Sequence, residues 1–489
     1  MKSNGKRLVA RFLIIWGITF ASCDPAAVSH PEKPNIILVM ADDQGWGDVA
    51  YNGHPVVQTP HLDEMAASGM RFNHFYAAAP LCSPTRGSIL TGRNPNRFAC
   101  FKWGHTLRPQ EITIAEVLKK EDYATGHFGK WHLGSVRTGS PVNPGASGFD
   151  QWFSALNFFD LDPILSREGV AEKVLGESSM VVVKEAIDFI REQVAADNPF
   201  FTVVWFGSPH NPHQTLDDYK QLYPDQPEEL QNFYGEITAL DRAVGKLRRE
   251  LQTLEIKENT LVWYCSDNGG LAKVGATGGR GHKSQLYEGG LRVPAIIEWP
   301  AGINGGQVEV PASTVDIFPT ILEITGISWQ SQIPIDGISL LPIIHGKQVQ
   351  RKNPMGFWSY PVPGDPVGVA LMEAHLQEQQ QNILSIDSSL LDLDAGNIID
   401  YPSDSFPGHA AWLDWPYKLH QLPGEKGVAY ELYNLSLDSM EQVNLAEKEV
   451  QAVQKMKGHL SRWQNSVLNS LNGGDYESND QKPITNQLE

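Results

Sequence analysis

One short stretch of the sequence combines a cysteine with a basic residue at helical spacing. Ser83 favours a helix N-cap, Pro84 suits the first helical position, and Gly92 can close the helix at its C-terminal end. This pattern places Cys82 at a helix N-terminus, where free N–H groups and the helix dipole stabilise negative charge. Arg86 falls on the same helical face, four residues on. Two interpretations of Cys82 stay open from these residues alone: a thiolate nucleophile of lowered pKa, or a buried cysteine before a capped helix.

Polar side chains follow four apolar, strand-like runs at the point where each run ends. They are Asp42 and Asp43 after residues 35–40, Lys130 and His132 after 123–128, His210 and His213 after 200–206, and Asp267 and Asn268 after 260–265. Taken singly, an Asp pair is more often a turn or a helix cap, and a lone histidine is more often structural. Because ligands bind beyond the carboxyl ends of parallel strands, however, four such groups predict one shared site at one edge of a sheet.

The elements needed to position these residues alternate along the chain. Amphipathic segments at 112–120, 179–194 and 230–251 lie between the apolar runs, which predicts an α/β fold with crossover helices. We expect a large, mixed but mostly parallel sheet sandwiched by helices over residues 34–355. The pattern loosens after about residue 300, and a strand at 429–435 with a helix at 447–468 predicts a smaller C-terminal α+β domain over 356–472. Residues 473–489 are expected to form a flexible tail.

The N-terminus has the pattern of an export signal. Four basic residues precede an apolar stretch at 12–20, which ends in small residues before Cys23. Residues 1–23 resemble a signal peptide with a bacterial lipobox, so we expect a periplasmic or cell-surface protein lipidated at Cys23. The alternative is ordinary signal cleavage and a soluble secreted protein. The three other cysteines, Cys82, Cys100 and Cys265, are too few for a disulfide framework.

Composition and charge narrow the class of partner. The chain has 489 residues, of which 41% are hydrophobic and 20% charged, as in ordinary globular proteins. Its formal net charge of −18 argues against nucleic acid or an anionic membrane surface as a partner. Contact with a membrane is expected only through the lipid anchor, and an anionic substrate would need a local basic pocket.

Several motifs, in order along the chain, carry a resemblance to one family. They are DDQGWGD at 42–48, CSPTR at 82–86, GKWHLG at 129–134, SDNG at 266–269, Lys283 followed by YEGGLRVP at 287–294, DIFPT at 316–320 and ELYNL at 431–435. CSPTR matches the C-x-P-x-R element that formylglycine-generating systems read. Over residues 34 to about 446 the chain resembles the formylglycine-dependent, type I arylsulfatase-like sulfatases of the alkaline phosphatase superfamily. Within YEGGLRVP we expect Glu288 and Arg292 to form a structural ion pair.

The resemblance implies a fold, a reaction and a set of roles. The fold would be alkaline-phosphatase-like, and the activity would be hydrolysis of sulfuric esters by formylglycine, which a maturation enzyme makes from Cys82. Ca²⁺ rather than Mg²⁺ would be held by Asp42, Asp43, Asp267, Asn268 and an oxygen of modified Cys82, an all-oxygen set that suits a hard cation. Arg86 would hold the hydrated aldehyde, His132 would relay its proton, Lys130 and Lys283 would bind sulfate, and His210 would contact sulfate or protonate the leaving oxygen.

The expected substrates are sulfated polysaccharides or oligosaccharides, with aryl sulfates as surrogates. Specificity is expected to lie in loops such as 155–167 and 360–410. Two alternatives stay open. The same site could hydrolyse phosphodiesters or phosphonate monoesters, or an unmodified Cys82 could leave a protein that only binds sulfated glycans.

Overall fold

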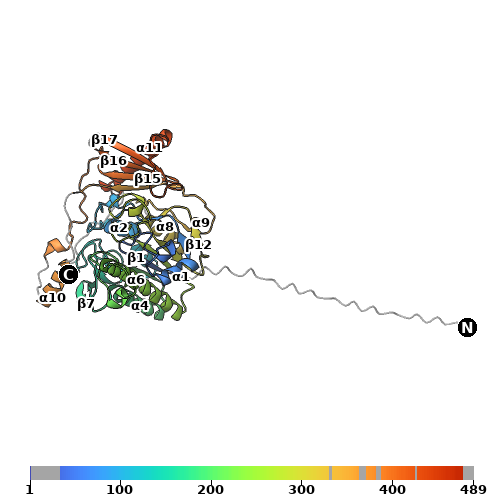
Figure 1. Ribbon diagram of the computed structural model, residues 1–489. Coiled ribbons are helices and arrows are strands. Elements are labelled where there is room, and N and C mark those ends of the chain that lie inside the picture. The colour runs from blue at the N-terminus through green and yellow to red at the C-terminus, as the bar shows by residue number, and fades with distance from the viewer. Residues whose placement is uncertain (2–32, 330–332, 363–369, 382–386, 425–426, 477–489) are drawn as a thin grey trace. The chain divides into compact units, whose positions relative to one another are not determined.

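The structure is a computed structural model that describes Met1 and residues 33–329, 333–362, 370–381, 387–424 and 427–476 (Figure 1). The predicted signal peptide and lipobox at 1–23, with Cys23, therefore lie outside the described residues. Among the helices that are described, none is long and apolar enough to cross a membrane.

A ten-stranded sheet forms the centre of the larger part. Its order is β12 (Gly306–Val308), β2 (Met70–Phe72), β11 (Ala295–Glu298), β9 (Thr260–Ser266), β1 (Asn35–Ala41), β8 (Phe200–Trp205), β4 (Ala124–Lys130), β5 (Gln151–Ala155), β6 (Ile164–Arg167) and β7 (Val170–Lys173). The five central strands β9, β1, β8, β4 and β5 are parallel, and most of the flanking pairs are antiparallel. The predicted mixed, mostly parallel sheet is confirmed.

Burial on both faces explains why the central strands are continuous apolar runs. All seven residues of β1 are buried. Ile36, Leu38 and Met40 enter the core on one face of the sheet. Ile37 and Val39 enter a separate core on the other face. A polar residue within the strand would therefore lie in one of the two cores, so the polar side chains stand after its end.

Helices cover both faces of the sheet. The core that contains Ile37 is covered by α1 (Pro60–Ser68), α4 (Ser178–Ala195) and α6 (Glu228–Thr253). The opposite core is covered by α2 (Cys82–Thr91), α3 (Ile114–Lys120) and α8 (Ile317–Thr325). The predicted helices at 112–120, 179–194 and 230–251 correspond to α3, α4 and α6. They form the sandwich that the alternation of strand and helix predicts (Figure 1).

Shorter elements complete the larger part. A three-stranded sheet has the order β10 (Arg292–Val293), β3 (Phe75–Tyr76), β13 (Ala312–Ser313). The remaining short helices are η1 (Ala50–Asn52), η2 (Pro95–Phe98), α5 (Asp217–Lys220), α7 (Glu288–Leu291), η3 (Thr314–Asp316), α9 (Leu341–Ile344), α10 (Ala370–Gln380) and η4 (Ser388–Leu390).

The C-terminal part is an antiparallel sheet covered by one helix (Figure 1). Its strands are β14 (Met355–Ser359), β15 (His409–Asp414), β16 (Tyr417–Gly424) and β17 (Gly427–Asn434), in that order. Helix α11 (Val450–Leu471) packs Met456 and Leu460 against Trp412 and Leu419 of the sheet. The predicted α+β character is confirmed, whereas the domain boundary at 355/356 stays a prediction, because residues from Pro34 onward form one compact unit.

The start of the predicted flexible tail differs from the structure. Asp475 forms an ion pair with Arg93, and the Tyr476 hydroxyl donates a hydrogen bond to Glu111. Both partners are buried, so residues 473–476 are held against the larger part. Residues 477–489 lie outside the described part of the chain, and the prediction for them stays a prediction.

Candidate active site

Helix α2 presents Cys82 as its first residue. Leu81 is the N-cap, in extended conformation at φ −149°, and Gly92 ends the helix in the left-handed conformation at φ 69°. The predicted helix and its closure by Gly92 are confirmed, but Ser83 is not the cap. Its hydroxyl instead accepts a hydrogen bond from the Gly104 amide at 2.7 Å. All ten residues of α2 are buried, so the helix fixes Cys82 rigidly.

The structure favours the second interpretation of unmodified Cys82, a buried cysteine before a capped helix. Burial raises the pKa of the thiol to about 11, although the ammonium groups of Lys130 and Lys283 oppose this rise. The helix N-terminus does not overcome the loss of solvent. At neutral pH the side chain is therefore a thiol, which is a weak nucleophile.

Four oxygen-bearing side chains meet beside Cys82 because β1 and β9 are parallel neighbours in register. Ala41 pairs with Ser266, so Asp42 and Asp43 leave one strand where Asp267 and Asn268 leave the other. The Asp43 amide donates to Asp267 Oδ1 at 3.1 Å, and Asn268 Nδ2 donates to Asp43 Oδ1 at 2.8 Å. All four residues are 0% exposed.

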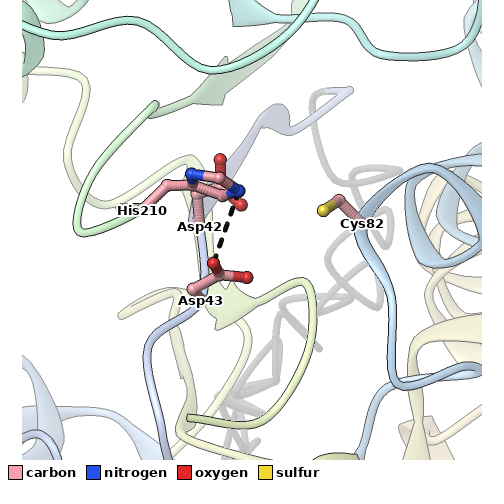
Figure 2. A group of neighbouring side chains, drawn as sticks. All are labelled: Asp42, Asp43, Cys82 and His210. Atoms are coloured by element: carbon pink, nitrogen blue, oxygen red, sulfur yellow. Dashed lines mark ion pairs between the residues drawn. The ribbon is translucent and has the colours of Figure 1, made fainter. Parts of the chain in front are cut away.

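This cluster fits a hard divalent cation. Asp42 Oδ1 and Asn268 Oδ1 are buried without a hydrogen-bond partner, which is the arrangement a metal would satisfy. Ligand atoms of Asp42, Asp43, Cys82 and His210 lie within 4.8 Å of one another. Figure 2 shows these four side chains pointing toward a common centre, with Cys82 opposite the two aspartates. Three carboxylates and an amide favour oxygen-seeking ions over zinc.

Two buried cations, Arg86 and Lys130, and the partly buried Lys283 balance the three buried carboxylates. Lys130 Nζ lies 2.5 Å from Asp42 Oδ2, Arg86 Nη2 lies 2.6 Å from Asp267 Oδ2, and Lys283 Nζ lies 2.7 Å from Asp43 Oδ2. Burial raises the pKa of Asp42 to about 8 against the attraction of Lys130. For Asp43, the attraction of the Lys283 ammonium overcomes the effect of burial and holds the pKa below its ordinary value.

The two site histidines are both neutral, because burial lowers the pKa of His132 well below its ordinary value and that of His210 to about 3. Both ring nitrogens of His132 lack a partner. His210 Nδ1 donates to the Asn211 carbonyl at 2.5 Å, so its Nε2 is the acceptor for Lys283 Nζ at 3.2 Å. The ring also stacks on Phe158, with centroids 4.3 Å apart. His210 is therefore fixed in one tautomer and one orientation.

A cavity of about 370 Å³ opens onto Cys82, His132, His210 and Lys283. It is lined by Leu81, Cys82, Trp103, His132, Asn157, Phe158, His210, Asn211, Lys283 and Ser284. Sequence reasoning missed Trp103, which no motif marks, and the individual roles of Asn157 and Phe158, although they lie in the loop expected to set specificity. His213 is not brought into this cavity. It lies 3.5 Å from Glu236 and contacts the ring of Phe233.

A buried polar network holds the segment that carries Lys283. Lys418 of β16 lies 2.9 Å from Glu288 and 3.2 Å from Glu441. The Glu288 amide donates to Glu441 Oε2 at 2.7 Å. The predicted Glu288–Arg292 ion pair is thus wrong, because Lys418 takes the carboxylate and Arg292 Nε donates to a backbone carbonyl. The C-terminal sheet therefore fixes the chain five residues after Lys283.

Comparison with known proteins places this geometry in a family. The sulfatase family model matches residues 34–327, more than half of the chain. The N-acetylgalactosamine-6-sulfatase of Canis lupus familiaris is 35% identical over 372 residues, covering 66% of this chain and 68% of that protein. An ulvan-active sulfatase of Formosa agariphila is 33% identical over 334 residues, covering 63% and 64%.

A solved structure shares the fold. The crystal structure of Ps i-CgsB in complex with k-i-k-neocarrahexaose has a TM-score of 0.74 at 24% identity, covering 88% of this chain and 93% of that one. At this identity the likeness supports the fold alone, whereas the family model covers residues 34–327 and so includes the residues of the site. The chain belongs to the sulfatase family, within the alkaline phosphatase superfamily.

Proposed function

We propose that this sulfatase removes sulfate esters from sulfated polysaccharides or their oligosaccharides, using formylglycine made from Cys82 and a bound Ca²⁺. The observation that carries the proposal is that Cys82 lines one cavity with the Lys283–His210 pair and, with His210, lies within 4.8 Å of the buried carboxylates of Asp42 and Asp43. Carbohydrate as the substrate class is supported by relatives named for N-acetylgalactosamine-6-sulfate and ulvan.

Asp42, Asp43, Asp267 and Asn268 would hold the metal, and the unpartnered oxygens of Asp42 and Asn268 support this assignment. When bound, Ca²⁺ would supply Lewis-acid polarisation and positive charge. The carboxylates are already balanced by Arg86, Lys130 and Lys283. The site would therefore be net positive with the ion present, which explains how an acidic protein attracts a sulfate ester.

Oxidation of Cys82 would replace a thiol of raised pKa with a more useful group. Hydrated formylglycine supplies an oxygen nucleophile on a carbon that can later release sulfate by C–O cleavage. His132 lines the same cavity, is neutral and has both nitrogens unpartnered, so it is suited to accept a proton from residue 82. Arg86 is pinned by Asp267 and by the Lys130 carbonyl, and it would fix the charge beside that residue.

The proton for the leaving oxygen would come from the Lys283–His210 pair. Neutral His210 carries its proton on Nδ1, facing the Asn211 carbonyl, so the proton available inside the cavity belongs to the Lys283 ammonium. We assign Lys283 as the proton source, His210 as its positioned partner, and Lys130 with Lys283 as sulfate-binding cations. Loss of Lys283 should therefore slow the hydrolysis of sugar sulfates by about 10²–10⁴-fold relative to the hydrolysis of 4-nitrophenyl sulfate, because the 4-nitrophenolate leaving group needs no proton.

A maturation enzyme would have to act on Cys82 before the chain folds. The motif at 82–86 lies in a helix that is buried along its whole length. It is therefore not accessible to another protein in the folded state. Export to the periplasm or cell surface, with lipidation at Cys23, is part of the same proposal and is supported by the sequence pattern of residues 1–23.

Paired substrates test the reaction class. Purified protein is assayed with 4-nitrophenyl sulfate and bis(4-nitrophenyl) phosphate, each with wild type and Cys82→Ala. We expect faster turnover of the sulfate, loss of that turnover in Cys82→Ala, and desulfation of at least one sulfated saccharide. Faster turnover of the phosphodiester would favour the phosphodiesterase alternative. Sulfate release that survives Cys82→Ala would refute formylglycine as the nucleophile.

A further inference from the structure

Helix α10 and residues 388–392, which include η4, form a roof beside the active site that the proposed reaction does not use. The Ser135 amide donates to Asp392 Oδ2 at 2.6 Å, and Arg137 Nη1 lies 2.6 Å from Glu378 Oε2. The Ala171 amide donates to the side chain of Gln379, also at 2.6 Å. Three charged or polar contacts thus tie the roof to the chain that follows β4 and to β7.

A second cavity, of about 150 Å³, lies under this roof. It shares His132 with the active-site cavity. At two more points of the chain, one residue lines the first cavity and its neighbour in sequence lines the second. Trp103 and Asn157 line the first cavity, whereas the next residue Gly104 and the preceding residue Leu156 line the second. The two cavities are therefore adjacent, and single residues such as His132 lie between them.

Two side chains that line the second cavity have buried polar atoms without partners, a donor on Arg137 and a ring nitrogen on His375. Arg137 is 6% exposed and His375 5% exposed, and both line it. Arg137 Nη2 and His375 Nδ1 have no hydrogen-bond partner, although Arg137 Nη1 is paired with Glu378. Buried polar groups in native proteins are almost always hydrogen-bonded. Two such atoms in one cavity indicate a ligand that supplies their partners.

The remaining lining indicates the chemistry of that ligand. Asp392 offers carboxylate oxygens, which accept from hydroxyl groups, while Met372 and Leu390 offer apolar surface. Since Arg137 already pairs with Glu378, its positive charge does not require a second anion. A ring with hydroxyl groups around its edge and C–H groups on its faces matches this lining, and a pyranose sugar has that form.

We propose that the second cavity binds the sugar residue that adjoins the sulfated one, so that the enzyme recognises an oligosaccharide of at least two residues. This inference rests on the proposed function, because the active-site cavity must hold the sulfated residue. Arg137, His375 and Asp392 act as specificity residues that bind the neighbouring sugar. They take no part in breaking the ester.

The test compares substrates that differ in whether they are long enough to enter the second cavity. One probe is 4-nitrophenyl sulfate. The others are sulfated monosaccharides and the matching oligosaccharides, prepared from ulvan, carrageenan and chondroitin 6-sulfate. The oligosaccharide turned over fastest is then used with Arg137→Lys, which keeps a cation for Glu378, and with His375→Phe. Arg167→Lys is the matched control, because Arg167 pairs with Glu172 and Glu185 and does not line the cavity.

We expect the oligosaccharide to exceed its monosaccharide in kcat/KM. Arg137→Lys should lower kcat/KM on the oligosaccharide by about 10- to 100-fold, as for loss of a hydrogen bond to a charged donor. His375→Phe should lower it by about 2- to 10-fold, as for loss of a hydrogen bond to a neutral ring, and both variants should leave aryl sulfate within about twofold. Met372→Trp, which fills the cavity, should act in the same way. Equal turnover of monosaccharide and oligosaccharide, or equal losses on all substrates, would overturn the subsite while leaving the sulfatase reaction intact. Turnover of aryl sulfate but of no saccharide would overturn the proposed substrate as well.

Discussion

Removing Lys418 should destabilise the protein strongly, although this lysine does not line the active-site cavity. Lys418 is 0% exposed and contacts two buried carboxylates, Glu288 at 2.9 Å and Glu441 at 3.2 Å. Although burial opposes it, these carboxylates raise the pKa of Lys418, so the lysine is charged at neutral pH. Lys418→Met keeps the length of the side chain and removes the charge.

The substitution leaves two buried carboxylates without their cation. Breaking a buried ion pair by removing one partner costs about 3–5 kcal/mol. We therefore expect urea unfolding at pH 7 to show a loss of about that size in the free energy of unfolding. Because Glu288 stands five residues after Lys283, kcat/KM for 4-nitrophenyl sulfate should fall as well.

An exposed lysine provides the matched control. Lys184 is 61% exposed and pairs with Asp188, so Lys184→Met should cost at most about 1 kcal/mol. Adding Glu288→Gln and Glu441→Gln to Lys418→Met should recover part of the loss, because neutral amides cost less to bury. The reasoning would be refuted if Lys418→Met were within 1 kcal/mol of wild type, or if the triple variant recovered nothing.

Three further predictions concern the backbone, pH and metal. Gly129 has φ 106°, and a Cβ there would lie 1.8 Å from the Trp205 carbonyl oxygen. Gly129→Ala should therefore lower the free energy of unfolding in urea by more than about 3 kcal/mol. Gly53→Ala, also at positive φ but with nothing within 4 Å of the added Cβ, should lower it by about 1 kcal/mol. Equal costs would contradict the steric argument. Burial lowers the pKa of His409 to about 3, so only the unfolded chain takes up its proton below pH 6.5; the stability of wild type relative to His409→Gln should decline from pH 7 to pH 4.5, and a pH-independent difference would count against this. Ca²⁺ added to chelator-treated protein should raise the Tm of wild type by ligand linkage and raise that of Asn268→Leu much less, whereas an equal rise in both would place the ion elsewhere.

The fold and the centre of the site were readable because parallel strands buried on both faces leave a plain pattern. Residues 35–40 and 260–265 are uninterrupted apolar runs, and the polar pairs after them had to share an edge once the strands were neighbours. The motif at 82–86 added what helix signals alone did not supply. Those signals left a low-pKa thiolate and a buried cysteine both open at position 82, and burial raises the pKa of the thiol.

What sequence reasoning missed depends on partners distant in the chain. Ser83 favours a cap by propensity, but the amide of Gly104 takes its hydroxyl. Glu288 and Arg292 have ion-pair spacing, but Lys418 lies 130 residues away and binds the carboxylate. His213 has the spacing of a second site histidine, yet Glu236 holds it elsewhere. The local sequence pattern does not show which residue, distant in the chain, will form the hydrogen bond or ion pair with a given group.

The most direct test of the account is the mass of the peptide that contains Cys82, isolated from enzyme that is active on 4-nitrophenyl sulfate. We predict a mass lower than that of the cysteine peptide by the difference between a thiol-bearing CH₂ and an aldehyde, together with reaction of the peptide with a hydrazine probe. An unmodified cysteine in fully active enzyme would contradict the assignment of residue 82 as the source of the nucleophile.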